Sequence, residues 1–275
     1  MVKIFNYIER SSPIHRMSGA SKLAVLLLVT LATMITFDTP FLLIVSVASC
    51  ALFPVSKIRI RDVKFIFILI VTFMVFNGAM IYLFAPEQGV AIYGTRHLLF
   101  TIAGHYTVTQ EQLLYQLNVM LKYVATAPFI LIFVATTNPS ELAASLNRIG
   151  VSYKISYSVA LMLRYIPDLI VEYQDISHSQ QARGIEMSKK GRLSKRMKAA
   201  AELCMPLILS SVERIEYISN AMELRGFGKN KKRTWYVQRK MKKADWITLF
   251  LAVLILVLDF VITFWDGSRY YNPFV

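Results

Sequence analysis

Two arginines, each followed by a glycine, are the residues of this chain whose type and position best fit a chemical task. They stand in Ala182-Arg183-Gly184 and in Leu224-Arg225-Gly226, 42 residues apart. A guanidinium group is planar, keeps its charge, and can bond several carboxylates or carbonyls at once. These residues therefore offer recognition of an acceptor-rich surface, in which no covalent bond is made or broken.

Sequence signatures of catalysis and cofactor binding are missing. The four histidines lie in separate segments, without an H-E-x-x-H motif or the Cys/His spacing of a metal site; they are His15, His97, His105 and His178. The sequence also lacks a G-x-x-x-x-G-K-[ST] loop for ATP and a G-x-S-x-G nucleophile elbow. We therefore predict no catalytic residue, no metal site and no cofactor. A membrane-embedded enzyme is the alternative, and it would need a convergent polar cluster within the apolar segments.

Each arginine ends a long helical pattern. Upstream of both, apolar residues alternate in steps of four and three, the spacing of a helix that packs along a partner helix. The two stripes are Ile155, Val159, Met162, Ile166, Leu169, Tyr173 and Ile176, and Met197, Ala201, Cys204, Ile208, Ser211, Ile215, Ile218 and Met222. Glycine is the usual residue at the left-handed end of a helix, and a cation is favoured beside the helix C-terminus. The pattern thus predicts two amphipathic helices that each present an arginine.

Composition places these helices in a membrane protein. Of 275 residues 55% are hydrophobic, against about 45–50% in soluble domains, and the mean hydropathy is +0.47. The net charge of +14 comes without a nucleic-acid recognition motif, so we expect no nucleic-acid partner. In membrane proteins an excess of Lys and Arg marks the cytoplasmic loops.

Five apolar segments are candidates for membrane spans. They cover residues 23–37, 41–55, 65–85, 113–137 and 246–265. The first two contain only 15 residues each, fewer than the roughly 20 that a spanning helix needs, so we expect a hairpin of short or tilted helices there, with a re-entrant pair as the alternative. We interpret Lys122 as snorkelling or facing the bundle, in preference to an intramembrane functional charge, and Asp259 as interfacial or facing the bundle.

The segment 138–243 differs in charge from the rest. It carries 20 Lys and Arg against 9 Asp and Glu, so the positive-inside rule assigns it to the cytoplasm. Asn138-Pro139-Ser140-Glu141 predicts a short capped helix up to Arg148, and a basic linker at 189–198 joins the two long helices. Segment 86–111 has little net charge and is expected outside as a loop. The amino terminus is then inside and the carboxyl terminus outside.

The predicted fold is an all-α integral membrane protein. About five transmembrane helices combine with a cytoplasmic domain of one short and two long amphipathic helices. The expected parts are residues 1–137, a membrane domain with about four spans; 138–243, the cytoplasmic domain; and 244–275, a final span with a short external tail.

Five short motifs in order resemble one known family between about Ser12 and Phe227. They are Ser12-Pro13-Ile14-His15-Arg16-Met17 with Lys22-Leu23, Thr136-Thr137-Asn138-Pro139, Leu163-Arg164-Tyr165-Ile166-Pro167, Ala182-Arg183-Gly184, and Ala221-Met222-Glu223-Leu224-Arg225-Gly226-Phe227. The chain is similar to the T component (EcfT, or CbiQ-like protein) of energy-coupling factor transporters, bacterial ABC-type importers of vitamins and metals. It departs from that family at Ser18-Gly19-Ala20-Ser21, where Asp-Pro-Arg is usual, and at Leu224, where alanine is usual.

The resemblance implies a scaffold without catalytic activity in the bacterial cell membrane, with residues 138–243 as its cytoplasmic coupling domain. Two ABC ATPase subunits (EcfA and EcfA′) would dock on the arginine ends, with Ala182, Arg183, Gly184, Leu224, Arg225 and Gly226 as docking residues. A separate membrane-embedded S component would bind the vitamin or metal and set the selectivity. The alternative within transport is a conventional ABC permease subunit that carries its own substrate pathway and needs no S component.

Overall fold

The structure, a computed structural model, describes residues 12–103, 106–184, 193–230, 234–236, 239–265 and 269–274. The chain divides into two compact units, Met1–Ser145 with Arg239–Val275 and Leu146–Gln238. We call the first the membrane unit and the second the crossed-helix unit. The amino-terminal residues 1–11, His105, and the first part of the predicted basic linker lie outside the described residues.

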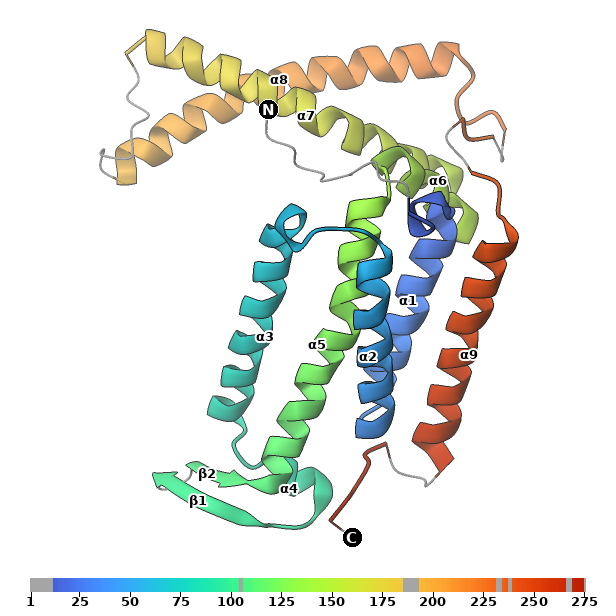
Figure 1. The fold of residues 1–275 in the computed structure, drawn as a ribbon. Helices are drawn as coiled ribbons and strands as arrows, with labels where there is room; N and C mark the ends of the chain where they lie inside the picture. The colour runs from blue at the N-terminus through green and yellow to red at the C-terminus, as the bar shows by residue number, and fades with distance from the viewer. Residues whose placement is uncertain are drawn as a thin grey trace. The chain divides into compact units, whose positions relative to one another are not determined.

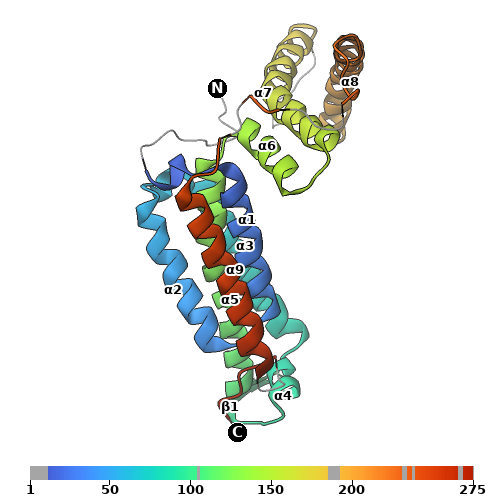
Figure 2. The same ribbon diagram turned by 90° about the vertical axis from the view of Figure 1, so that its right-hand side faces the viewer.

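The membrane unit is a bundle of five apolar helices that lie side by side (Figures 1 and 2). They are α1 (Gly19–Ile35), α2 (Thr39–Val55), α3 (Lys64–Phe84), α5 (Gln110–Thr136) and α9 (Lys243–Trp265), with 3-10 turns at Ile14–Arg16 and Ile60–Asp62. Helix α5 is the centre, since α1, α2 and α3 all pack against it, while α9 packs against α1. The predicted all-α membrane fold is confirmed.

Length separates these helices into two groups. Helices α3, α5 and α9 are long and apolar enough to cross a membrane, whereas α1 and α2 have 17 residues each. At about 1.5 Å per residue, 17 residues reach ~25 Å, somewhat less than the ~30 Å hydrocarbon core. Helix α3 is the most exposed of the long spans: only 6% of its apolar window is buried.

Side-chain caps determine where several helices begin. Ser18, Asp38 and Thr109 precede α1, α2 and α5, and the side chain of each accepts a hydrogen bond from the backbone N–H three residues later. These bonds satisfy donors that have no partner inside the helix. The turn after Asp38 also contains a proline within the first helical positions, where its missing N–H costs nothing.

Two charged residues inside the spans, Lys122 and Asp259, face the bundle, which confirms one of the two interpretations given for each from the sequence. Lys122 is 9% exposed; its Nζ donates to the Met34 carbonyl at 3.4 Å and lies 3.3 Å from the centroid of the Phe37 ring. Asp259 is fully buried and accepts from Thr263 Oγ1 at 3.3 Å. Hydrogen bonds and the cation–π contact offset part of the cost of removing these charges from water.

The segment predicted as an outside loop contains regular structure. Helix α4 (Gln88–Tyr93) is followed by the antiparallel strands β1 (Leu98–Ala103) and β2 (Tyr106–Thr109). Glu111, two residues after β2, is fully buried and accepts hydrogen bonds from Thr95 Oγ1 at 3.0 Å and from the His97 backbone N–H at 3.0 Å, both between α4 and β1. The loop prediction was therefore too simple, because a buried carboxylate orders this segment.

The crossed-helix unit contains the two long helices. Helix α6 (Pro139–Ile149) begins in the membrane unit and ends in this one, and α7 (Tyr153–Ala182) and α8 (Leu193–Leu224) follow. Figure 1 shows α7 and α8 crossing. The contact between them includes an ion pair between Arg214 and Glu172 at 2.7 Å, and Ser210 Oγ also donates to Glu172.

The crossing corrects the prediction that each apolar stripe packs along a partner helix. Several stripe residues remain more than half exposed: Ile155 58%, Met162 57%, Met197 74%, Ile208 56% and Ile215 62%. The buried residues of the unit include Leu163 and Leu203, which lie off the predicted stripes. Spacing identified both helices correctly, but it did not indicate that the two cross instead of lying along one another.

The close contact at Gly89 provides a test of the fold around α4 and the start of α5. A Cβ at this position would lie 2.4 Å from the Glu111 carbonyl carbon and 2.5 Å from the Gln112 nitrogen, both backbone atoms. Overpacking of this kind costs typically about 1–3 kcal/mol. We expect Gly89→Ala to lower the melting temperature of the chain in detergent, while the exposed neighbour change Gln88→Ala leaves it within about 1 °C. Equal melting temperatures for Gly89→Ala and wild type would contradict the contact.

Candidate functional site

The first candidate site is the end of α7. Arg183 is the C-cap: its backbone N–H donates to Ser179 O at 3.2 Å and to Gln180 O at 3.1 Å. Gly184 has a φ of +87° and donates to Gln181 O at 3.0 Å. The helix therefore ends where the sequence predicts it, with Ala182, Arg183 and Gly184 all exposed. A non-glycine residue would find the left-handed backbone at position 184 unfavourable.

The second candidate site, the end of α8, is closed by the same hydrogen-bond pattern. The Arg225 N–H donates to Ala221 O at 3.2 Å, and Gly226 has a φ of +66° and donates to Glu223 O at 2.8 Å. The Phe227 N–H then reaches back to Met222 O at 2.9 Å, which completes a Schellman motif. Both predicted helix ends are confirmed as glycine-terminated, each with an exposed arginine directly after the last helical residue.

The two arms beyond the crossing have equal length. Ten residues separate Glu172 from Ala182, and ten separate its ion-pair partner Arg214 from Leu224. At about 1.5 Å per residue each helix extends ~15 Å past the pair. Because α7 and α8 cross, their C-terminal ends point to opposite sides of the unit (Figure 1). The fold thus places the two arginines apart, at two separate positions that resemble each other locally.

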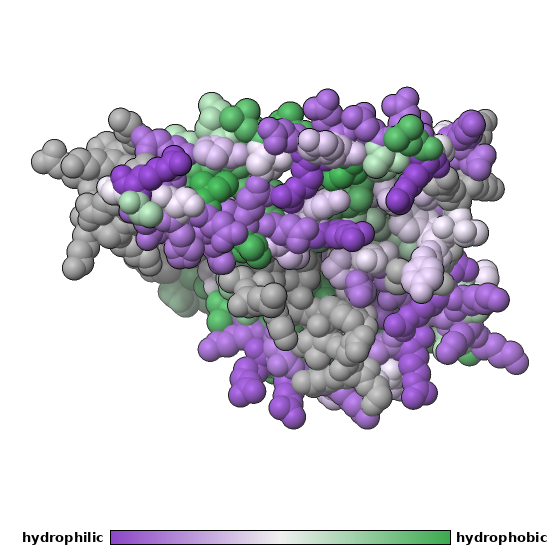
Figure 3. All heavy atoms as spheres, turned by 90° about the horizontal axis from the view of Figure 1, so that it is seen from above, coloured by the Kyte–Doolittle hydropathy of each residue, from purple (hydrophilic) through white to green (hydrophobic). Residues whose placement is uncertain are grey.

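The exposed residues at the end of α8 are mixed in character. Figure 3, a view of the molecule from above, shows mainly hydrophilic side chains with separate apolar patches among them. Leu224, immediately before Arg225, is 90% exposed. The exposed leucine offers apolar area beside a charged donor, and arginine is enriched among the residues that contribute most to protein interfaces.

An aromatic cluster holds the end of α8 and was not predicted from the sequence. The Phe227 ring lies 5.6 Å from Tyr153 and 4.8 Å from Tyr157, both in the first turns of α7. Trp235 joins the cluster at 5.5 Å from Tyr153, and its Nε1 donates to Asn147 Oδ1 at 3.1 Å. The segment after Arg225 is therefore packed onto the corner between α6 and α7. A tryptophan within a lysine- and arginine-rich stretch was the sequence signal that could have indicated this contact.

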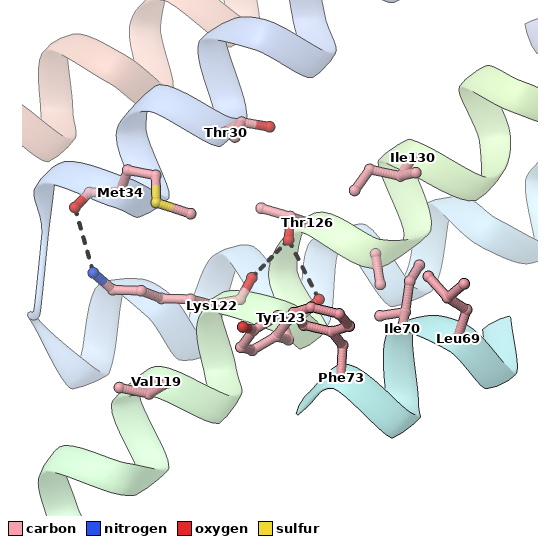
Figure 4. A pocket seen from close by; sticks show the side chains of 11 residues that line it. Thr30, Met34, Leu69, Ile70, Phe73, Val119, Lys122, Tyr123, Thr126 and Ile130 are labelled. Carbon is pink, nitrogen blue, oxygen red and sulfur yellow. Dashed lines mark hydrogen bonds between the residues drawn. The ribbon is translucent and has the colours of Figure 1, made fainter. Parts of the chain in front are cut away.

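The membrane unit contains a groove that is a candidate substrate site by its volume and position. It has a volume of about 410 Å³ and is lined by α1, α3 and α5. Figure 4 shows apolar side chains such as Leu69, Ile70 and Phe73 around it, with the Lys122 amine turned to the Met34 carbonyl. Thr126 Oγ1 donates to the Lys122 carbonyl at 2.8 Å. The Lys122 amine and the Thr126 hydroxyl are thus both bonded to carbonyls of the chain.

The part of the chain that the structure describes contains no candidate metal site. No group of three His, Cys, Asp or Glu side chains lies close enough there to hold a metal ion. The residues Cys50 and Cys204 are both exposed, and neither forms a disulfide.

Comparison with known proteins gives a consistent result. Residues 10–236 match the family CbiQ, described as cobalt transport protein. The chain is 31% identical over 176 residues to the energy-coupling factor transporter transmembrane protein EcfT of Leuconostoc gelidum subsp. gasicomitatum, covering 61% of this chain and 65% of that protein. It is 29% identical to the protein of the same description in Staphylococcus aureus, over 61% of this chain and 68% of that one.

A third relative aligns along nearly its whole length. The EcfT protein of Lactococcus lactis subsp. cremoris is 27% identical over 272 residues, which cover 94% of this chain and 96% of that protein. The match to the Leuconostoc protein, in contrast, spans slightly less than two thirds of that protein's length.

The aromatic cluster generates a prediction about the end of α8. Phe227→Ala removes two ring pairs, each worth about 0.5–1.5 kcal/mol beyond buried area. We expect limited trypsin digestion to cleave after Arg225 faster in this variant than in wild type. Tyr236→Ala is the matched control, because Tyr236 belongs to the same segment but is fully exposed, at 103%. If both variants are cleaved at the wild-type rate, the cluster does not hold the end of α8.

Proposed function

Since the chain belongs to the CbiQ family of cobalt transport proteins and is a membrane component of an energy-coupling factor transporter, we propose that it couples ATP hydrolysis to uptake. In this proposal two cassette ATPases bind the chain at Arg183 and Arg225. A separate substrate-binding protein lies beside the apolar helices in the membrane. The chain itself catalyses no reaction and transmits movement between its partners.

The observation that carries the proposal is the pair of equal helix arms. Each arm ends in an exposed arginine followed by a glycine with positive φ, and the two ends point to opposite sides of the crossed-helix unit (Figure 1). Two such ends suit two ATPase subunits, one for each arginine. Ala182, Gly184, Leu224 and Gly226 complete the docking surfaces.

Arginine is well suited to this contact. Its planar fork can donate to several carbonyl or carboxylate oxygens of a groove at once and loses little entropy in doing so. A helix C-terminus also keeps the charge close to the partial negative charge of the helix dipole. The helix behind the arginine gives the contact a rigid lever through which a movement of the ATPase reaches the rest of the chain.

A conventional permease with its own substrate pathway fits the membrane unit less well. Such a protein needs polar groups that are directed into a cavity to bind a hydrophilic substrate. In the groove of Figure 4 the Lys122 amine and the Thr126 hydroxyl instead bond to carbonyls of the chain. We therefore assign substrate recognition to the separate membrane partner, for which the exposed faces of α3 offer apolar contact area.

The proposal includes an orientation in the bacterial cell membrane. Residues 138–243 lie in the cytoplasm as the coupling domain, because the ATPases need cytoplasmic ATP and this segment carries an excess of 11 positive charges. Helix α4, the β-hairpin and the C-terminal tail then lie outside.

The arginine ends can be tested by replacement. Truncation of an anchoring arginine at an interface often costs about 2 kcal/mol or more, which is about a 30-fold loss of affinity. We expect Arg183→Ala with Arg225→Ala to be inserted in the membrane as wild type but to lose both ATPases on purification in detergent, and to lose uptake. Co-purification and uptake into proteoliposomes are the measurements.

Arg148→Ala is the matched control. Arg148 is an exposed arginine in the last turn of α6, which also ends before a glycine with positive φ, Gly150 at +117°. We expect this variant to retain both ATPases. A double variant at positions 183 and 225 that binds both ATPases and transports normally would refute the docking role. A wild-type chain that transports without a second membrane protein would favour the permease.

A further inference from the structure

The chain passes between its two units at two places, and one set of side chains lies beside both. It leaves the membrane unit after Ser145, within α6, and returns at Arg239, shortly before α9. Glu141 lies one helical turn before Ser145, the last residue of the first stretch of the membrane unit. Arg239 is the first residue of the second stretch. Arg239 Nε is 3.8 Å from Glu141 Oε1. An ion pair within the membrane unit therefore links the segment where the chain leaves this unit to the segment where it returns.

Glu141 also connects this pair to the start of α1. Its carboxylate is 3% exposed and accepts a hydrogen bond from the Gly19 backbone N–H at 2.8 Å. The sequence predicted a capping role for Glu141 within its own helix; the structure instead directs the side chain to a different helix. Arg239 Nη1 reaches the same region, where it donates to the His15 carbonyl at 2.6 Å.

Asp245, in the first turn of α9, makes the corresponding contact from the other side. It is 1% exposed and accepts from the Ser18 backbone N–H at 2.8 Å and from Ser21 Oγ at 2.6 Å. Its second oxygen accepts from the Lys242 N–H at 2.8 Å. The first backbone donors of α1, which have no partner within the helix, thus bond to carboxylates of α6 and α9.

Lys22 completes the set and balances its charge. Its Nζ donates to the Thr136 carbonyl in the last turn of α5 at 2.9 Å. Two carboxylates and two cations, drawn from α1, α6, α9 and the residues before α9, therefore meet around the first turn of α1. We call Lys22, Glu141, Arg239 and Asp245 the α1 junction.

Packing at the junction leaves no space for a side chain at position 19. A Cβ on Gly19 would lie 2.7 Å from Ser145 Oγ and 2.8 Å from Glu141 Cγ. The Ser145 hydroxyl is itself held by Glu141 O at 2.6 Å. Helices α1 and α6 therefore approach as closely as the glycine allows, and a movement of α6 must displace α1 or break these contacts.

We propose that the α1 junction is the element that passes movement of the coupling helices to the membrane helices, with Glu141, Arg239 and Asp245 as positioning residues. The proposal rests on the proposed coupling function. A rigid junction converts displacement of α6 and of the chain before α9 into displacement of α1, α5 and α9. A loose junction lets the crossed-helix unit follow the ATPases while the membrane helices stay in place. Coupling then fails although every partner is still bound.

The test uses the whole chain reconstituted in proteoliposomes with its two ATPases and its substrate-binding protein. ATPase retention, ATP hydrolysis and uptake are measured together, with a panel of B vitamins and divalent metal ions as the offered substrates. We expect Gly19→Ala and Arg239→Gln to retain both ATPases and to hydrolyse ATP within about twofold of wild type, while uptake per ATP falls about tenfold, a typical size for coupling between sites. Arg239 is half-exposed, so its variant tests the junction even if the Gly19 variant does not fold.

Lys243→Gln is the control, since it removes an exposed charge two residues from Asp245 without touching the junction. Glu141→Gln tests the charge, because an amide can still accept from the Gly19 N–H but cannot pair with Arg239; we expect an intermediate loss of uptake per ATP. Hydrogen–deuterium exchange of the isolated chain in detergent should be faster in α6 for Gly19→Ala and Arg239→Gln than for wild type.

Two results would overturn the proposal. One is unchanged uptake per ATP in both junction variants; the other is a loss of uptake that only follows the loss of bound ATPase. A wild-type chain that retains no ATPase would instead refute the coupling function itself. The two failures are distinguishable, because the first is seen in the variants and the second in wild type.

Discussion

The contact at which α7 and α8 cross includes the ion pair between Glu172 and Arg214, and the positions of both arginine ends follow from that crossing. The pair is partly exposed, at 20% for Glu172 and 34% for Arg214, so its own contribution to stability is modest, about 1 kcal/mol or less. The pair matters more for the geometry of the contact. Ser210 bonds to the same carboxylate, and the Arg214 guanidinium lies 5.8 Å from the centroid of the Tyr165 ring. Measured from this contact, the C-terminal arms of α7 and α8 have equal length.

The two arms differ in what holds them. The end of α8 is packed by Phe227 onto Tyr153 and Tyr157, and Trp235 fastens the same segment to α6. At the end of α7 the described contacts are those of the helix cap itself. Arg225 therefore projects from a packed corner, and Arg183 projects from the end of a helix. Two ATPases that bind the two ends would meet surfaces of unequal stiffness, although the arginine–glycine endings are alike.

The sequence was informative wherever a local rule decides the structure. Apolar periodicity located α7 and α8, and the arginine–glycine pairs located their ends, because a helix terminus depends on the residues beside it. The apolar segments likewise located the five helices of the membrane unit. Contacts between distant segments were less accessible: the Glu141–Gly19 bond joins residues 122 positions apart, and a pattern confined to one helix favoured a local cap. The crossing of α7 and α8 was missed for the same reason. The pairing of β1 with β2 is local, and it was missed because residues 86–111 were interpreted as a loop.

The central claim is that the arginine ends touch cassette ATPases, and photo-cross-linking tests it most directly. A photoreactive amino acid would replace Leu224, which is 90% exposed beside Arg225, and, as the control, Tyr217, which is 76% exposed two turns earlier on the same helix. The account predicts that irradiation of membranes from cells with the full transporter links position 224 to a cassette ATPase, and position 217 much less. Cross-links from position 224 to lipid alone, or to no ATPase above the level at position 217, would contradict it.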